Sequence, residues 1–438
     1  MPLLIVVLGI VLLLVLILVL KLNSFLAFII VSLAVAVAEG MPLDKAVVSV
    51  EQGIGSTLGI LVVILGLGAM LGKLVADSGA AYRITTSLTR LFGISRVQWA
   101  LMLTAFIVGV PLFYDVGFVI MMPIVFAVAT STGVPLLYVG LPTLAALSVT
   151  HGYLPPHPAP TAIAVMFHAD IGKTLVYGTI IAIPAIIIAG PVLSRGLKKV
   201  RATPMAEFTG VKMAEVSQMP GLFTSIVSAL LPVMLIGFAT IAQNLLPVES
   251  QVRRVSSWVG NPAVAMVISL LLAIYTLGVA RGRTMADIMD SLTHSISSLT
   301  MVMLIIAGAG GLKQVLVDSG VSKYIGDLLS ASPFSPLFLG WLIATILRIC
   351  VGSATVAGIT TAGIVLPLVE RSGVSPELMV LAIGSGSLMT AHVNDGGFWL
   401  VKEYFNLSIK DTIKTWTVME TSVGVTGLVG VFVLNYLI

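Results

Sequence analysis

The sequence Asp77-Ser78-Gly79 recurs 241 positions later as Asp318-Ser319-Gly320, and each copy follows a glycine-rich apolar run. His151 is matched by His392 at the same offset, and both lie where an apolar segment is interrupted by proline, glycine or asparagine. Paired interruptions in the two halves of a membrane chain indicate the binding site of a transporter. We therefore expect two related halves, residues 1–194 and 222–438, joined by a polar linker over 195–221.

The composition is that of an integral membrane protein. Of the 438 residues, 58% are hydrophobic and only 10% are charged, whereas a soluble domain carries roughly 25% charged residues. The run Leu3–Leu20 is continuously apolar and does not alternate, which favours helices over a barrel. It has no basic segment before it, so we interpret it as a retained helix and not as a signal peptide. The net charge of +4 reflects basic loops and gives no reason to expect nucleic acid, and the single cysteine, Cys350, excludes a disulfide within the chain.

The apolar stretches predict both ordinary and irregular membrane segments. Stretches of about the length of one span lie near 3–20, 25–40, 56–76, 173–194, 222–247, 262–279, 299–316 and 415–437. The stretches near 98–130 and 335–369 are too long for one span and carry small or helix-breaking residues near their middles, so we predict two re-entrant hairpins. The segments near 135–166 and 376–401 contain the paired interruptions and are predicted to be broken helices.

The basic residues predict the orientation. With the N-terminus outside, 15 Lys and Arg fall on the cytoplasmic side and 6 on the other. The two Asp-Ser-Gly copies are then an odd number of spans apart, so Ser78 and Ser319 are expected on opposite faces. An odd number of spans per repeat makes the two halves inverted repeats.

Three ionisable residues lie within apolar segments. Asp115 and Arg348 fall in the two predicted hairpins, and Asp395 falls in the second broken helix. Such groups are costly at membrane depth and usually face a pathway. A structural ion pair between Arg348 and a carboxylate is the alternative. Asp115 is the favoured proton carrier and Asp395 the second choice, because burial among apolar residues favours the neutral form of a carboxylate.

The broken helices offer polar groups of two kinds. Four prolines between His151 and Thr161 cannot stay in an α-helix, so they free carbonyl groups and leave a new helix N-terminus near Thr161, which favours anions. The stretch His392-Val-Asn394-Asp-Gly-Gly-Phe is predicted to provide free carbonyl groups and a new helix N-terminus as well, with glycines in place of prolines. For His157 alone, a structural role is an equal alternative. No cluster of Cys or carboxylates accompanies the histidines, so we expect no metal site.

Four motifs resemble those of the gluconate:proton symporter family, within the ion transporter superfamily. They are Phe113-Tyr-Asp-Val-Gly-Phe-Val, His151-Gly-Tyr-Leu-Pro-Pro-His-Pro-Ala-Pro-Thr-Ala, Gly352-Ser-Ala-Thr-Val-Ala and His392-Val-Asn-Asp-Gly-Gly-Phe-Trp, and the similarity extends over essentially the whole chain. The resemblance implies an inverted-repeat transporter with two re-entrant hairpins, two broken helices and a homodimer. The hairpin tips of related dicarboxylate transporters carry Ser-Asn-Thr. The carboxylate of Asp115 at the first tip departs from that pattern and suits proton coupling.

The expected function is proton-coupled import of gluconate or a closely related hydroxy-carboxylate across a bacterial inner membrane. The substrate would be bound by Arg348, Ser353, Thr355, His151, His157, Thr161, His392 and Asn394, with Asp115 or Asp395 carrying the proton and no cofactor. A sodium-coupled carrier, or a D-serine-type substrate, is the alternative on the same scaffold. A passive anion channel and a membrane-embedded hydrolase are less consistent with the sequence, because it contains neither a repeated pore-filter loop nor a nucleophile with a base at recognisable spacing.

Overall fold

The computed structural model describes residues 2–197, 200–204, 219–297, 299–321, 324 and 333–438, and every regular element among them is a helix. The helices of the first half are α1 (Pro2–Leu14), α2 (Ser24–Ala38), α3 (Leu43–Asp77), α4 (Ala80–Phe92), α5 (Val97–Gly109), α6 (Tyr114–Thr132), α7 (Leu136–Tyr153), α8 (Pro158–Met166), α9 (Ile171–Ile187) and α10 (Leu193–Gly196).

The helices of the second half are α11 (Leu222–Leu245), α12 (Gln251–Val259), α13 (Pro262–Ala273), α14 (Met285–Ser297), α15 (Thr300–Asp318), α17 (Pro336–Val351), α18 (Ala354–Ser372), α19 (Pro376–Gly386), α20 (Gly396–Tyr404), α21 (Ile409–Thr412) and α22 (Val418–Leu437). Most of the linker predicted over 195–221 lies outside the described residues.

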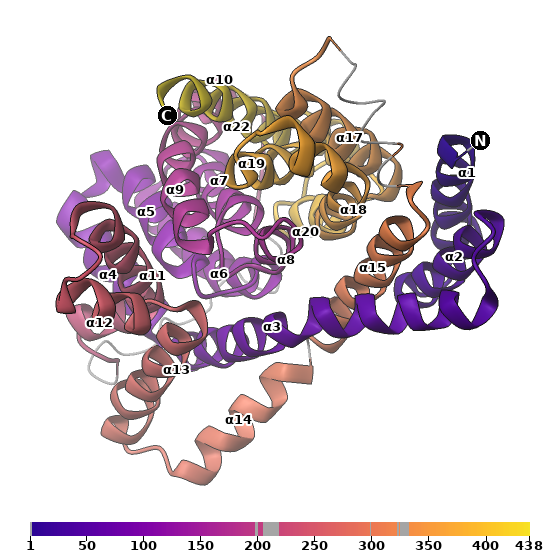
Figure 1. Ribbon diagram of the computed structural model, residues 1–438. Helices are drawn as coiled ribbons and strands as arrows, with labels where there is room; N and C mark the ends of the chain where they lie inside the picture. The colour runs from indigo at the N-terminus through magenta and orange to yellow at the C-terminus, as the bar shows by residue number, and fades with distance from the viewer. Residues whose placement is uncertain (1, 198–199, 205–218, 298, 322–323, 325–332) are drawn as a thin grey trace.

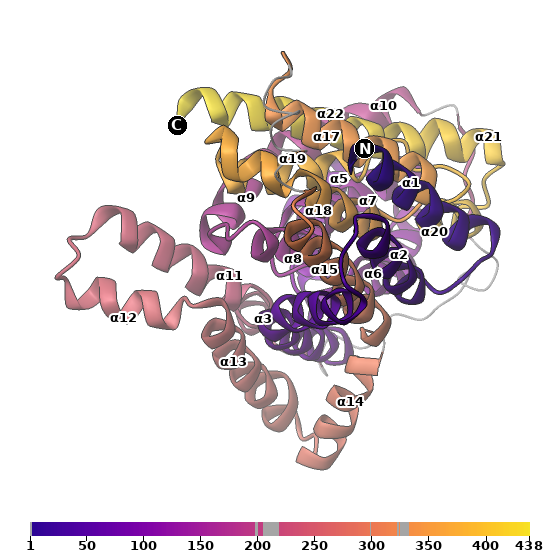
Figure 2. The ribbon, with the colours of Figure 1, turned by 45° about the vertical axis from the view of Figure 1, so that its right-hand side comes forward.

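The long helix α3 runs along one side of the molecule, with α1 and α2 at its beginning and α4, α11 and α13 near its end (Figure 1). Helix α15 packs along α3, and α14 lies at the edge of the molecule, where it also packs against α3 (Figure 2). Helices α5–α9 and α17–α22 form the remaining body, in which α5 packs on α7 and α17 packs on α18 and α19. The chain thus places residues from both halves around one interior.

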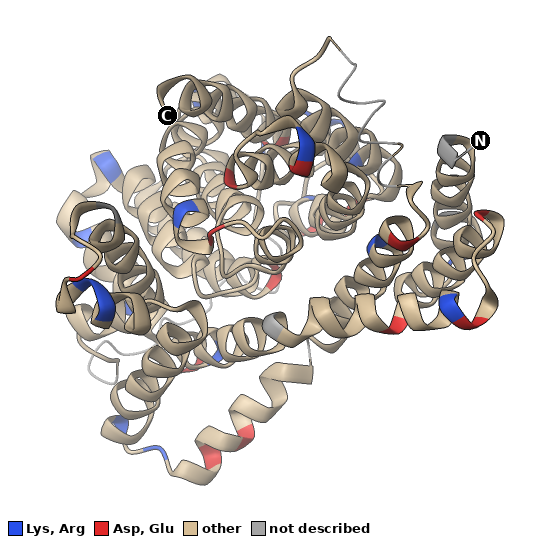
Figure 3. Cartoon of the chain, viewed as in Figure 1, with Lys and Arg blue, Asp and Glu red and all other residues tan. Residues whose placement is uncertain are grey.

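The composition of the helices fits a multi-pass membrane protein, as predicted. Among the described residues, seven helices are long and apolar enough to cross a membrane, or up to nine when each of two bent pairs is counted as one span. Charged residues lie mostly at helix ends and on the edge of the molecule (Figure 3). Large apolar side chains such as Phe223, Phe238 and Tyr275 are exposed, which suits contact with lipid.

Three amphipathic helices were not anticipated from the sequence, namely α4, α12 and α14. In α4, Ala80, Ile84 and Leu88 recur every four residues and are buried, while Arg83 and Arg90 are on the other face. A search for continuous apolar runs misses such helices because half of each surface is polar. Helix α3 is also longer than the predicted span 56–76, since it begins at Leu43.

The segments predicted as hairpins are each two helices joined by a short break. Residues 110–113 separate α5 from α6, and residues 352–353 separate α17 from α18. Gly352 has a positive φ of 78°, and a Cβ there would collide with the backbone carbonyl of Asn394, so the second tip needs glycine. Whether either pair enters and leaves the membrane on one side stays a prediction.

The predicted broken helices are interrupted where the sequence places proline or glycine. Helix α7 ends at Tyr153 and α8 begins at Pro158, whose missing N–H is tolerated in a first turn. Helix α19 ends at Gly386, and α20 begins at Gly396 after a longer irregular stretch. Each break leaves a new helix N-terminus, which is buried at Pro158 of α8 and exposed at Gly396 of α20.

The two Asp-Ser-Gly motifs make reciprocal contacts. Asp77, at the end of α3, accepts a hydrogen bond of 2.7 Å from the Ser291 hydroxyl of α14. Asp318, at the end of α15, accepts one of 2.5 Å from the Ser49 hydroxyl of α3. Each carboxylate therefore meets a serine near the beginning of the corresponding segment in the other half. This is the pattern that a two-fold relation would produce, and the inverted orientation itself stays a prediction.

Candidate functional site

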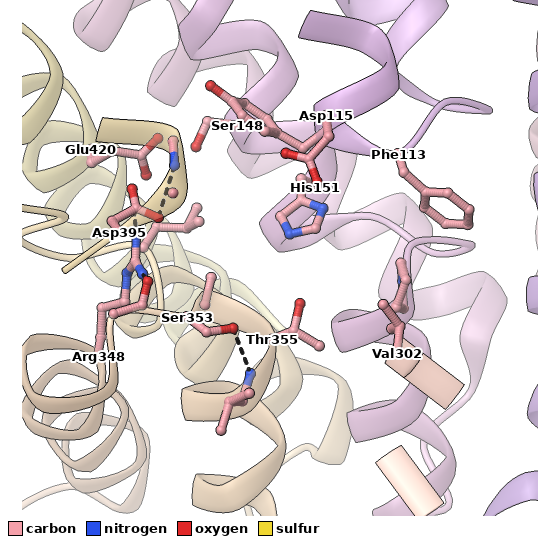
Figure 4. Close-up of a pocket in the computed structure, with 18 of the residues that line it drawn as sticks. Phe113, Asp115, Ser148, His151, Val302, Arg348, Ser353, Thr355, Asp395 and Glu420 are labelled. Atoms are coloured by element: carbon pink, nitrogen blue, oxygen red, sulfur yellow. Dashed lines mark hydrogen bonds and ion pairs between the residues drawn. The ribbon is translucent and has the colours of Figure 1, made fainter. Parts of the chain in front are cut away.

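A pocket of about 420 Å³ lies between the two halves of the chain (Figure 4). Its walls come from the two hairpin tips (residues 110–113 and 352–353), the second break (387–395) and the residues on either side of the first break (154–157), together with α7, α15 and α22. The lining residues include Phe113, Tyr114, Asp115, Ser148, His151, Pro158, Val302, Arg348, Ser353, Thr355, Asp395, Gly396, Trp416 and Glu420. A pocket of this size is within the range of roughly 300–1,000 Å³ that is typical of small-molecule sites.

Four helices begin at residues that line this pocket. They are α6 at Tyr114, α8 at Pro158, α18 at Ala354 and α20 at Gly396. The first turn of a helix carries unpaired N–H groups and a partial positive charge, so each N-terminus favours an anion. Two of these helices come from each half of the chain. These helix N-termini add partial positive charge to a pocket whose charged side chains are Arg348, Asp115, Asp395 and Glu420.

Arg348 supplies the fixed positive charge of the pocket. It is 3% exposed on α17, its Nη2 lies 3.2 Å from Asp395 Oδ2, and its Nη1 donates to the Gly352 carbonyl. Its Nε is buried and has no hydrogen-bond partner among the described residues. The structural ion pair considered from the sequence is thus present, and the Nε–H of the guanidinium takes no part in it.

Asp395 is held by three groups. Besides Arg348, it accepts a hydrogen bond of 3.0 Å from Trp416 Nε1 and one of 3.2 Å from the Gly397 N–H. The last contact makes it the N-cap of α20. A cation, an indole and a backbone amide thus fix the position of this carboxylate at the start of α20.

The other polar residues of the second break cap α17. The Asn394 amide donates to the carbonyl of Ile349 at 2.8 Å and to that of Cys350 at 3.3 Å. His392 Nε2 lies 3.1 Å from the same Ile349 carbonyl. These contacts satisfy carbonyl groups that have no partner within the last turn of a helix. Neither His392 nor Asn394 lines the pocket.

The first break contains buried polar atoms without partners. His157 Nε2 lies 2.8 Å from the carbonyl of Gly109, the last residue of α5, while its Nδ1 has no partner among the residues that the structure describes. His151 lines the pocket, and neither its Nδ1 nor the hydroxyl of the fully buried Thr161 is hydrogen-bonded to any described residue. The rings of His151 and His157 pack edge to face with centroids 5.5 Å apart. Of these three residues, only His151 reaches the pocket.

Asp115 and the second tip face the pocket from different sides (Figure 4). Asp115 is exposed in the first turn of α6 and makes no ion pair with any residue that the structure describes. Ser353 caps α18, because its hydroxyl accepts the Val356 N–H at 3.4 Å. Thr355 lies in the first turn of α18.

Glu420 and its partner Ser148 were not anticipated from the sequence. Glu420 is 1% exposed, lines the pocket from α22 and accepts a hydrogen bond from the Ser148 hydroxyl of α7. It went unnoticed because the apolar run 415–437 was interpreted as an ordinary span. The signal was present, since it is the only acidic residue in that run.

Comparison with known sequences identifies the family. The description "GntP family permease" matches residues 1–437. The chain is 52% identical to the high-affinity gluconate transporter of Escherichia coli strain K12, with 100% of both chains covered. It is 50% identical to the Gnt-II system L-idonate transporter of the same strain, with 99% of both covered. It is 47% identical to the gluconate permease of Bacillus subtilis strain 168, again with 100% of both covered.

Solved structures show the same fold at low sequence identity. The YdaH transporter of Alcanivorax borkumensis superimposes with a TM-score of 0.65 at 15% identity, covering 94% of this chain and 97% of that one. MtrF of Neisseria gonorrhoeae gives the same TM-score at 14% identity, with 94% and 93% covered. The family predicted from the motifs is thus confirmed, and the chain belongs to the GntP family of permeases, which are multi-pass membrane transporters and not enzymes.

Proposed function

We propose that this permease is a proton-coupled symporter that imports gluconate or a closely related hydroxy-carboxylate across a bacterial inner membrane. The observation that carries the proposal is the convergence of four helix N-termini and Arg348 on one pocket between the halves. This arrangement favours a small anion. The printed functions of the relatives, gluconate and L-idonate transport, supply the substrate class.

The substrate carboxylate would lie against Arg348 and the first turns of α18 and α20. The Nε of Arg348 has no hydrogen-bond partner among the described residues. Charge-assisted hydrogen bonds to a carboxylate are stronger than those between neutral groups. The hydroxyl groups of the substrate would meet Ser353, Thr355 and His151, which all line the pocket. His157, Thr161, His392 and Asn394 would act indirectly, by fixing the backbone at the breaks.

Asp115 is the proposed site of proton exchange with the open side of the pocket. It has no ion-pair partner among the described residues, whereas Asp395 is engaged by Arg348 and Trp416. Of the two carboxylates considered from the sequence, Asp115 therefore has the greater freedom to change its charge.

Transport by the purified protein in vesicles would test both parts of the proposal. Labelled gluconate should accumulate inside the vesicles when the outside is made more acidic than the inside, with or without a sodium gradient. Competition by idonate, glycerate, lactate and D-serine should follow the similarity of each compound to gluconate. Accumulation that requires sodium, or stronger competition by D-serine than by idonate, would contradict the proposal.

A further inference from the structure

Glu420 is a buried carboxylate in the pocket wall that the proposed mechanism has not used. It lies in α22, within a continuous helical segment from Ile409 to Leu437. Its side chain is 1% exposed, and its Oε2 has no hydrogen-bond partner among the described residues. A buried polar atom without a partner is costly in a structural role, so it calls for a functional explanation.

Glu420 makes no ion pair with any described residue. Arg348, the nearby cation, is already engaged by Asp395 and by the Gly352 carbonyl. Within the described part of the chain, the group that donates to Glu420 is the neutral Ser148 hydroxyl. A buried carboxylate that lacks a cation is held far more easily as the neutral acid.

The surroundings determine what the charge of Glu420 would do. The charged and titratable groups around it are Arg348 on α17, Asp395 before α20, His151 and Tyr153 on α7, and Tyr114 and Asp115 on α6. The Tyr153 hydroxyl does not donate to Glu420, since it donates to the Val423 carbonyl at 2.6 Å. Apart from the histidine, the only basic group in this set is Arg348. An ionised Glu420 would therefore compete with a substrate carboxylate for the same guanidinium.

We infer that Glu420 holds the coupled proton while the substrate is bound, and that its neutral form is what allows Arg348 and the helix N-termini to accept a second carboxylate. The inference rests on the proposed proton symport. One proton adds to the Glu420 carboxylate, giving the acid, before the anion binds. The acid loses that proton to the cytoplasmic side after the anion has left. Asp115, on the open side, remains the group that exchanges protons with solution.

This arrangement couples the two ligands through charge. Binding of the proton favours the substrate, and by reciprocity binding of the substrate favours the proton. With one linked proton, the affinity for gluconate should fall by up to about tenfold for each pH unit above the midpoint. The neutral amide of glutamine should remove that dependence, since it cannot ionise.

The test compares wild type with Glu420→Gln in vesicles and in detergent. The variant should bind and exchange gluconate without a gradient, with an affinity that changes less than about twofold over roughly three pH units. It should not accumulate gluconate when a pH gradient is imposed, and gluconate should cause no proton uptake. The matched control is Glu403→Gln, on an exposed side chain of α20, which should behave as wild type.

A second pair of variants keeps the inference testable if Glu420→Gln does not reach the membrane. Ser148→Ala removes the hydroxyl that stabilises the charged carboxylate, so the pH midpoint of gluconate binding should move upward. Its control is Ser269→Ala, a buried serine of α13 whose hydroxyl bonds only within its own helix, to the Ala265 carbonyl. An unchanged midpoint in Ser148→Ala would overturn the inference.

The outcomes separate the two proposals. If wild type ignores the pH gradient, proton symport is rejected, and the role of Glu420 fails with it. If wild type accumulates gluconate and Glu420→Gln still does so, symport stands and only the role of Glu420 is rejected.

Discussion

The two breaks that meet at the pocket differ in how their polar groups are used. In the second break, Asp395 is bound by Arg348 and Trp416, and Asn394 and His392 cap α17. In the first break, four prolines lie between His151 and Thr161, and several buried polar atoms have no hydrogen-bond partner in the described part of the chain. Both breaks nevertheless support a neighbouring helix end, since His157 contacts the carbonyl of Gly109 as Asn394 contacts that of Ile349.

The difference indicates a division of labour between the first tip and break and the second tip and break. The second tip and break fix a charge in place, which suits recognition of a substrate carboxylate, while Glu420 of α22, which we infer to hold the coupled proton, lies outside both. The first tip and break present the mobile charge of Asp115 and the ring nitrogen of His151 that has no partner among the described residues. We therefore expect changes in the first tip to affect coupling and changes in the second tip to affect affinity.

Asp115→Asn should have the largest effect. The amide cannot exchange a proton, so accumulation driven by a pH gradient should be abolished, while exchange without a gradient should persist in part. Vesicles with and without the imposed gradient measure the two activities separately. If Asp115→Asn still concentrates gluconate, proton exchange does not pass through the first tip, and the division between the two tips and breaks fails.

Arg348→Gln should weaken binding without abolishing coupling. A charge-assisted hydrogen bond contributes roughly 1.5–3 kcal/mol, so the affinity for gluconate should fall about tenfold or more. Calorimetry on the purified protein would measure it, with Arg254→Gln on the exposed face of α12 as the control. Wild-type affinity in Arg348→Gln would make this arginine purely structural, and the pocket would then have to bind anions through its helix ends alone.

Asp395→Asn should reduce binding and exchange together by a smaller factor. Asparagine keeps the N-cap of α20 and an acceptor for Trp416, but it leaves Arg348 without its buried counter-charge. The thermal stability of the variant should therefore fall as well. A variant that loses only gradient-driven accumulation would instead make Asp395 the proton carrier and would reverse the assignment made from its contacts.

The sequence predicts the scaffold better than it predicts the site. The helical membrane class follows from composition, and the positions of the tips and breaks follow from glycine and proline, because these residues act on their own backbone. Side-chain partners depend on helix packing, which the sequence does not show. Thus the contacts of His392 and Asn394 with the end of α17, and the place of Glu420 in the pocket wall, could not be predicted from the sequence.

The smallest effects on affinity should come from two threonines that occupy similar positions in the sequence. Thr161 in α8 and Thr355 in α18 both lie near a new helix N-terminus, but only Thr355 lines the pocket. The Thr161 hydroxyl is fully buried without a hydrogen-bond partner, so replacement by the similarly shaped valine should leave affinity within about twofold and should not destabilise the protein.

Thr355→Val should remove one hydrogen bond to a substrate hydroxyl. Such a bond between neutral groups contributes about 1 kcal/mol, which corresponds to roughly a fivefold loss of affinity. Competition binding with gluconate and with a shorter hydroxy acid would show whether the loss depends on the hydroxyl chain of the substrate. The opposite ranking, with Thr161→Val the weaker binder, would place the hydroxyl groups of the substrate in the first break. In that case His157 and Thr161 would form hydrogen bonds with the hydroxyl groups of the substrate. The binding site would then extend past His151 into the proline-rich segment.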